Sequence, residues 1–322
     1  MKKIISLIII IVTLSTSIFV FSTNVFCDEM DTQNTINNVT YVKESENGKT
    51  FYSIMSFEND KNPKKVQKEI TVLEQIDGIP VRKICNFDFH NDYNNSIIET
   101  INLPDTIEYI DSYAFLNMKN LKKINIPKSI KIIGENAFAN CMSLEEVIFP
   151  KKKFKIRAKA FWNCKKLKKV DLGNVTMIKH SAFYNCKSLK KLKLPKTLKV
   201  TGYCFLWGTP VTSLVAPKNL HYKGNSFNNL KKLKTITFKS LDYGFVEGAF
   251  YNCKSLKEVH LESVKKFNNF KVGSETFSNT KSGIKFFVRN KKLAKILYNG
   301  LNKSKIKSAK IYVNKKLIYK TK

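Results

Sequence analysis

Apolar residues recur along the chain in a frame of 22 or 23 residues, most visibly at a phenylalanine near the middle of each unit. The marker residues are separated by 23, 23, 22, 22, 22, 23 and 27 residues, intervals that chance does not produce. They are Phe115, Phe138, Phe161, Phe183, Phe205, Phe227, Phe250 and Phe277. A fixed period of this length indicates a solenoid, because one unit cannot bury its apolar side alone and must stack on its neighbours.

Each unit predicts extended segments joined by turns. In the unit that contains Ile124 and Ile126, these residues alternate with polar ones, so one face of a short strand points inward. Pro127 ends that strand because it cannot donate to a ladder, and a second extended stretch leads into Ala137-Phe138. We therefore expect an α/β repeat solenoid over residues 81–280, with a parallel β-sheet on its concave face and short helical or 3-10 turns.

The flanking segments predict a small cap at each end of the array, which a solenoid needs to shield its terminal cores. Residues 28–80 are expected to form an N-terminal β-hairpin cap and lead-in, with the hairpin turn at Asn47-Gly48. Residues 281–322 are expected to form a basic C-terminal cap. Its elements are a strand over 284–290, a helix over 291–300 that ends at Gly300, and a hairpin over 309–319.

The order of charged, apolar and small residues in 1–27 predicts a signal peptide. Lys2 and Lys3 precede an apolar run from Ile4 to Phe21, and Val25 and Cys27 are small enough to flank a cleavage site after Cys27. Two alternatives stay open: lipidation of Cys27, from whose pattern Phe26 departs, and an uncleaved anchor of marginal spanning length. The protein is thus expected to be secreted or at the cell surface, with membrane contact only through one of these two alternatives.

The frame I-x-x-I-x-x-x-A-F-x-x-C-x-x-L-x-x-I-x-L-P resembles the BspA-type leucine-rich repeats of bacterial surface and secreted proteins. It covers roughly residues 81–280, and "ITVLEQIDGIPVRKI" (70–84) resembles the lead-in of such arrays. The resemblance implies a curved leucine-rich-repeat solenoid that acts through protein or surface contacts, often in adhesion, without catalytic residues. Met118 replaces the Cys of the frame, Cys204 stands where Ala is expected, and residues 206–210 depart from it. The sixth repeat is therefore expected to be irregular.

The charge balance narrows the range of partners. The chain has 57 Lys and Arg against 25 Asp and Glu, a formal net charge of +32, yet only Arg82, Arg157 and Arg289 are arginines. Arginine is the residue that reads base edges bidentately, whereas lysine acts as a hydrated point charge. This composition favours general attraction to polyanions over specific recognition of nucleic acid.

Chemistry-bearing residues do not assemble into a catalytic or metal-binding pattern. The histidines His90, His180, His221 and His260 lie far apart in the sequence, and none of the 12 glycines builds a phosphate loop. We expect no enzyme activity, no cofactor and no metal.

Two residue types recur at fixed positions of the frame. Cys141, Cys164, Cys186 and Cys253 share one position and are expected to be small buried thiols, with a metal ladder or disulfides between adjacent repeats as alternatives. Asn140, Asn163, Asn185 and Asn252 are expected to form a ladder that satisfies backbone groups of the turns.

Two surfaces are candidates for binding. Solvent positions on the concave face give Lys123, Lys169, Asp171, Lys191, Lys193, Thr235, Thr237 and His260 as candidate partner-binding residues. No acid follows Glu275, while residues 276–322 hold 14 Lys or Arg interleaved with aromatic residues. The candidate polyanion-binding residues there are Arg289, Lys291, Lys292, Lys295, Lys305, Lys307, Lys315 and Lys316.

The sequence therefore predicts an exported, cell-surface-associated, non-catalytic protein that mediates protein–protein interaction or adhesion. Its partner would be a protein or a cell-surface macromolecule, with no specific nucleic acid and no metal. The alternative is an attachment protein whose lysines bind an anionic wall polymer or a glycosaminoglycan.

Overall fold

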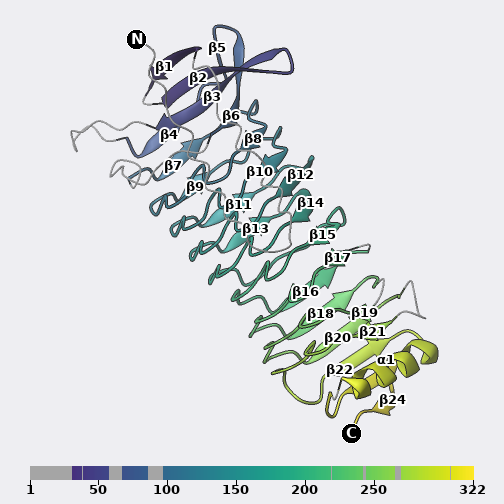
Figure 1. Cartoon of the computed structure of the whole chain (residues 1–322). Helices are drawn as coiled ribbons and strands as arrows, with labels where there is room; N and C mark the ends of the chain where they lie inside the picture. Colours follow the sequence, from purple (N-terminus) through teal and green to yellow (C-terminus); the bar gives the residue numbers. More distant parts are fainter. Residues whose placement is uncertain are drawn as a thin grey trace, which may run out of the picture.

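The computed structural model describes residues 31–37, 39–57, 67–85, 97–218, 220–241, 244–264, 270–304 and 306–322. These residues form an elongated stack of turns that runs from an N-terminal hairpin to a C-terminal helix (Figure 1). Each repeat contributes one turn of the stack, called a rung below. The expected signal peptide, His90 and Lys305 lie outside the described residues.

One wall of the solenoid, the first-strand face, contains the strands that hold the Ile124–Ile126 pattern and its equivalents. It consists of three parallel sheets in succession. The first contains β4 (Glu69–Thr71), β7 (Thr100–Asn102) and β9 (Lys123–Ile124), and the second contains β11 (Glu146–Ile148) and β13 (Lys169–Asp171). The third begins with β16 (Ser213–Ala216), β18 (Thr235–Phe238), β20 (Glu258–Leu261) and β22 (Lys285–Val288).

A second wall, the second-strand face, is also a parallel sheet and is the longer of the two. Its strands are β6 (Ile79–Ile84), β8 (Tyr109–Ile110), β10 (Ile132–Ile133), β12 (Lys153–Ile156), β14 (Asn174–Ile178), β15 (Val200–Thr201) and β17 (His221–Tyr222). β19 (Gly244–Phe245) pairs with β21 (Lys271–Val272) farther along, and β5 (Gln75–Ile76) pairs with β6. The predicted solenoid is confirmed, but it has two sheet walls where one was expected.

The third wall, the turn face, is formed by the segments around Ala137-Phe138 and their equivalents. Successive turns are joined by backbone hydrogen bonds, such as Phe138 N to Ala160 O at 2.7 Å and Asn140 N to Trp162 O at 2.8 Å. Within a turn, bonds such as Cys141 N to Phe138 O at 3.2 Å span three residues, as in a 3-10 turn. The short turns are thus single 3-10-type turns rather than helices.

The core contains a column of phenylalanine rings, one in each rung outside the sixth repeat. The ring centroids of Phe115 and Phe138, and of Phe138 and Phe161, are 5.0 Å apart, and those of Phe161 and Phe183 are 5.3 Å apart. These spacings are close to the roughly 4.8 Å between paired strands, so the rings stack because the backbones do. All four rings are fully buried.

The column changes register in the sixth repeat. Phe161 N bonds to Ala182 O, but Phe183 N bonds to Phe205 O, so Phe205 occupies the alanine position and Leu206 replaces the marker phenylalanine. Gly208, with φ +74°, then takes the position of the asparagines, and residues 192–194 form no strand. The expected irregularity is confirmed. The assignment of Phe205 as a marker was wrong.

The N-terminal cap is a hairpin that extends the second-strand face. β1 (Asp31–Ile36), β2 (Val39–Glu46) and β3 (Lys49–Phe57) are antiparallel, and β3 pairs with β6 in parallel. Asn47 and Gly48 have positive φ angles, which confirms the predicted turn. The ammonium of Lys83 lies 3.3 Å from Asp111 and 3.8 Å from Glu44, and thereby links the hairpin to the array.

The C-terminal cap covers the last rung with helix α1 (Lys291–Lys303) and the hairpin of β23 (Lys310–Val313) and β24 (Lys316–Lys320). Asn290 caps the helix by accepting from Leu293 N at 2.8 Å. The predicted end at Gly300 was wrong, because α1 continues to Lys303. A Cβ at Gly300 would lie 2.8 Å from Val272 Cγ2. Gly300 therefore permits close packing inside the helix instead of ending it. The predicted terminal hairpin is confirmed.

Candidate functional site

The first-strand face holds its predicted residues in two outward-facing rows. Lys123, Lys169, Asp171, Lys191 and Lys193 are exposed. Thr235, Thr237 and His260 are half-buried. Lys191 and Lys193 lie in residues 191–195, where the expected strand is absent.

Ion pairs between successive rungs neutralise part of this charge. Lys169 pairs with Glu146 of the preceding rung, and Lys151 lies 3.3 Å from the carboxylate of Asp171. Along the adjacent edge, the ammonium of Lys122 lies 2.6 Å from Glu99, and this hydrogen bond lowers the pKa of the glutamate. Lys123, Lys191 and Lys193 form no ion pair with a described residue. The pKa of Asp171 is nevertheless lowered by the hydrogen bond from Gly173 N, by Lys151 and, to a smaller extent, by the charge of Lys193.

A groove opens on the first-strand face where its first two sheets separate. Its volume is about 710 Å³. Leu103 N donates to the side-chain oxygen of Asn125 at 2.7 Å, while the equivalent Phe149 N donates to a backbone oxygen, that of Asp171. The side chain of Asn125 thus replaces a ladder bond between the rungs of β7 and β9, within the first sheet. The sheet break itself lies one rung later, between β9 and β11.

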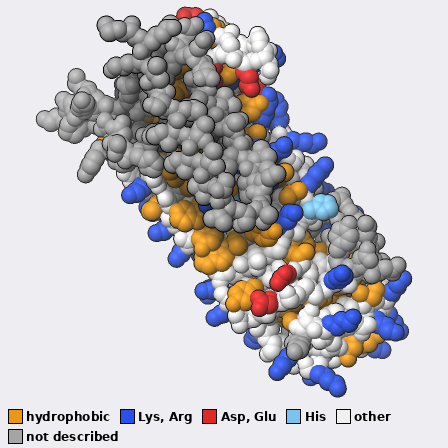
Figure 2. All heavy atoms as spheres, in the orientation of Figure 1, with side chains coloured by type: hydrophobic (Ala, Val, Ile, Leu, Met, Phe, Trp, Pro, Cys, Tyr) orange, Lys and Arg blue, Asp and Glu red, His pale blue; other side chains and the backbone are white. Residues whose placement is uncertain are grey.

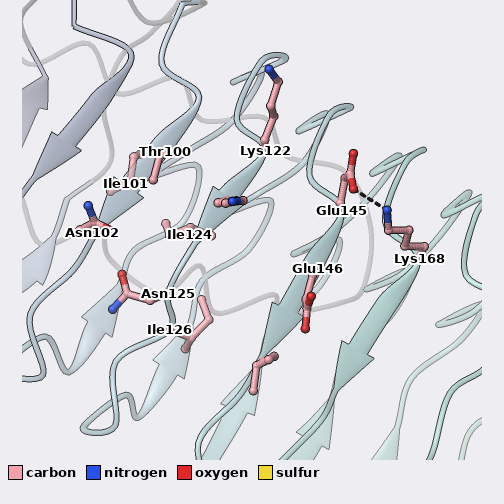
Figure 3. Close-up of a pocket in the computed structure, with 12 residues that line it drawn as sticks. Thr100, Ile101, Asn102, Lys122, Ile124, Asn125, Ile126, Glu145, Glu146 and Lys168 are labelled. Atoms are coloured by element: carbon pink, nitrogen blue, oxygen red, sulfur yellow. Dashed lines mark hydrogen bonds and ion pairs between the residues drawn. The ribbon is translucent and has the colours of Figure 1, made fainter.

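The groove combines an apolar surface with a charged rim. Ile101, Ile124, Ile126 and Ile148 line it together with amides and charged groups, and Ile148 is 52% exposed. Figure 3 shows these side chains spread over neighbouring rungs, with the Glu145–Lys168 pair near one end of the strands. Sequence reasoning missed the groove because the repeat frame is the same on both sides of the break between β9 and β11 and gives no signal for it.

The opposite end of the first-strand face carries an aromatic row. The ring of His260 stacks on Phe287 with centroids 4.6 Å apart, and Phe287 stacks on Tyr312 at 5.1 Å. These residues are opposite one another in the paired strands β20, β22 and β23. His260 is therefore the first residue of an aromatic row that continues through Phe287 to Tyr312 in the C-terminal cap.

The candidate polyanion-binding residues lie on two elements at the C-terminal end. Lys291, Lys292 and Lys295 are exposed on α1, and Lys315 and Lys316 are exposed in the β23–β24 hairpin. Arg289 and Lys307 are exposed nearby, with Arg289 lying 3.9 Å from Glu262. Of the interleaved aromatic residues, Phe277 and Phe286 are core residues, so they are not available to a ligand.

The repeat cysteines are buried, free thiols. Cys141 donates to Phe115 O at 3.1 Å and Cys164 to Phe138 O at 3.1 Å, each in the preceding rung, and Cys186 and Cys253 make the same contact. Burial raises the pKa of all four, to about 12 for Cys253. The structure thus has the expected buried thiols, which also bind backbone carbonyls.

The repeat asparagines bind one another. Asn140 donates to Asn117 at 2.7 Å, Asn163 to Asn140 at 2.8 Å and Asn185 to Asn163 at 2.8 Å. Each has φ near +60°, a conformation that asparagine tolerates better than most residues. The predicted ladder is present, but its amides bond to one another instead of to the turn backbone. It is interrupted at Gly208 and resumes where Asn252 donates to Asn229.

Among the residues that the structure describes, no group of His, Cys, Asp or Glu is arranged to hold a metal ion. The same segments contain no helix that could traverse a bilayer.

Stacked rungs with parallel walls, a phenylalanine column and an asparagine ladder define a leucine-rich-repeat solenoid, a class of protein that presents extended surfaces to partners. Residues 83–207 and 199–321 match the BspA type Leucine rich repeat region, with six copies. The chain belongs to this family.

Two solved structures share the fold. The pneumococcal vaccine antigen PcpA has a TM-score of 0.51 and 18% identity, with 90% of this chain and 100% of that chain covered. A leucine rich cell surface protein from Faecalibacterium prausnitzii has a TM-score of 0.52 and 18% identity, with 82% and 86% covered. At such identity the likeness concerns the fold alone. No curated protein matches the chain significantly.

Proposed function

We propose that this is an exported, surface-associated protein that binds a macromolecular partner through its first-strand face and does not catalyse a reaction. The observation that carries the proposal is the pair of outward rows on this face, which backbone ladders hold at fixed spacing over many rungs. Such an arrangement suits recognition of an extended surface. The family, and the description of one fold relative as a cell surface protein, support the proposed location.

Charge reversal on the first-strand face tests this proposal. The triple variant Lys169→Glu, Lys191→Glu and Lys193→Glu should lose partners captured from host matrix or purified cell wall. The matched control reverses three exposed lysines of the second-strand side, Lys155, Lys199 and Lys223, and changes the net charge equally. Equal retention by both triple variants would contradict the proposal.

A second candidate function is attachment to an anionic wall polymer, supported by the acid-free segment after Glu275. Contacts made only by lysines should weaken steeply as salt rises, because bound counterions are released on binding. Truncation after Gly283 is unsuitable as a test, since it removes β22 and uncovers the last rung. Replacement of Lys291, Lys295, Lys315 and Lys316 by Gln keeps the cap and should reduce retention on purified wall, if attachment is the function.

A further inference from the structure

A group of aromatic side chains gathers on the turn face of the middle rungs, away from the surfaces discussed above. Trp162, Tyr184 and Trp207 occupy one position in three successive rungs. The centroids of Trp162 and Tyr184 are 6.2 Å apart, and those of Tyr184 and Trp207 are 4.3 Å apart with an interplanar angle of 2°. His180 and Tyr203 share a second position, four residues earlier in each rung, and form a separate pair with centroids 6.4 Å apart. We call the three stacked residues Trp162, Tyr184 and Trp207 the aromatic patch.

The fold does not require aromatic residues in this column. The other rungs place Leu116, Ala139, Asn228, Tyr251 and Ser278 at the same position. Tyr203 is 49% exposed, His180 is exposed, and the three column residues are half-buried. Both tryptophans of the chain thus lie in one surface group that packing alone does not explain.

The patch offers hydrogen-bond donors to solvent. An indole N–H can only donate, and within the described part of the chain neither Trp162 nor Trp207 has a hydrogen-bond partner. The hydroxyl group of Tyr184 is likewise without a hydrogen-bond partner there. A ligand that covers the patch should therefore bring acceptors.

The positive charge of the rungs around the patch also favours a ligand that carries hydrogen-bond acceptors and negative charge. Residues 147–241 contain 23 Lys or Arg and one acid, Asp171, which lies on the first-strand face. Lys159, Lys165 and Lys187 are exposed within three residues of the column in sequence. On the face visible in Figure 2, Lys and Arg side chains occur along the whole array, whereas acidic ones are few. The middle rungs therefore attract a negatively charged partner.

We propose that the aromatic patch is a docking site for an acidic segment of a partner protein. Tryptophan and tyrosine are the residues that most often dominate protein–protein binding energy. Tyr184 and Trp207 each cover one ring face of the other, and Tyr184 also meets Trp162. The stack therefore favours contacts of carboxylates and apolar side chains with ring edges and donors over a sugar ring laid on an open face. The site is separate from the first-strand face and rests on the proposed function only in that a macromolecular partner is bound.

Tryptophan fluorescence tests the proposal directly, because both tryptophans lie in the patch. The probe is a short peptide rich in Glu, Asp and Leu, titrated into the full chain at physiological salt. Saturable change of the emission is expected. The same peptide with Gln and Asn in place of the acids should give no change. A response to a sulfated oligosaccharide in place of the acidic peptide would overturn the proposal in favour of a glycan.

A pair of variants separates the patch from overall charge. Tyr184→Ala retains both reporters and the net charge, and should weaken peptide binding by at least about tenfold. Tyr251→Ala removes a tyrosine from the same position two rungs beyond Trp207 and should bind like the parent. Thermal melting verifies that both variants fold. Equal affinity of the two variants would refute the docking site.

The first-strand triple variant separates this proposal from the proposed function. With Lys169, Lys191 and Lys193 reversed, peptide binding at the patch should persist within about threefold, because the variant keeps every aromatic residue of the patch. Loss of the peptide in this variant, with Tyr184→Ala still binding, would place the acidic ligand on the first-strand face instead.

Discussion

At the scale of single residues, the phenylalanine column shows how repeated small contacts stabilise the array. Phe161 stacks on Phe138 and Phe183 and also meets the edge of Phe149, with centroids 5.7 Å apart. Its removal leaves a cavity that the backbone ladders on three walls prevent from collapsing.

We expect Phe161→Ala to lower the free energy of unfolding by about 3–5 kcal/mol, the usual cost of emptying a buried phenylalanine site. Denaturant titration measures it. Ile148→Ala is the control, because Ile148 is 52% exposed and should change stability by less than about 0.5 kcal/mol. A smaller effect of Phe161→Ala than of the control would contradict the stacked core.

The buried thiols make stability depend on pH on the alkaline side. Burial raises their pKa in the folded state, to about 12 for Cys253, so they stay protonated while the unfolded chain loses these protons above about pH 8.5. The unfolded state then binds fewer protons, and the free energy of unfolding should fall between about pH 9 and pH 12 by about 1.4 kcal/mol per pH unit for each thiol.

Denaturant titration from pH 7 to pH 10 measures this slope, and Cys164→Ala should make it shallower. Alkylation gives a second measurement. The half-buried Cys204 should react first, while Cys141, Cys164, Cys186 and Cys253 should react only as the array unfolds. Rapid labelling of all of them in the native protein would contradict their burial.

At the scale of elements, the first strand of each repeat could be predicted from the sequence, whereas the second-strand sheet could not. The alternation of Ile124 and Ile126 predicted the first strand, because side chains of a strand alternate between faces. Ile132-Ile133 is too short to show alternation, so the sheet that it forms with its neighbours was not foreseen. For the candidate sites, the exposed positions of the first-strand face were predicted from the repeat period. The groove and the aromatic patch were not, because they depend on side chains that differ between repeats.

The contribution of the asparagine ladder to stability can be tested at Asn163. Asn163 combines a left-handed backbone with two amide bonds, one to Asn140 and one to Asn185. Asn163→Gly retains the backbone freedom and loses only the amide bonds, about 0.5–1.5 kcal/mol each. Asn163→Ala should cost about 1–2 kcal/mol more, because alanine resists φ near +60°. Thermal melting ranks the two variants.

Gly208 offers the converse substitution. A Cβ at this position would meet no atom closer than 3.8 Å, and its nearest neighbours belong to Asn185. Gly208→Asn should therefore extend the ladder from Asn185 and leave the melting temperature unchanged or higher. A marked loss of stability would show that the sixth repeat does not align with its neighbours as described.

At the scale of the whole molecule, contacts run mainly between adjacent rungs. Deletion of residues 147–169 joins Glu146 to Val170, which stands opposite Val147 in the sheet and so preserves the register. We expect a shorter, folded array, because stability in a solenoid is a sum over rungs and their interfaces. Circular dichroism and small-angle scattering should give the parent's spectrum and a reduced length, and an unfolded product would contradict this.

The irregular sixth repeat has a mechanical consequence. Between the ring of Phe183 and that of Phe227 the aromatic column is interrupted, the asparagine ladder is broken at Gly208, and no strand forms over 192–194. The second-strand face stays paired across the same repeat, from β14 through β15 to β17. Under a force that pulls the two ends of the array apart, we therefore expect the first-strand face to open here while the second-strand face holds, so that the array bends at the sixth repeat before it unfolds. If one end is anchored and a partner is bound at the other, as proposed above, this bend would take up strain before the rungs that bind the partner.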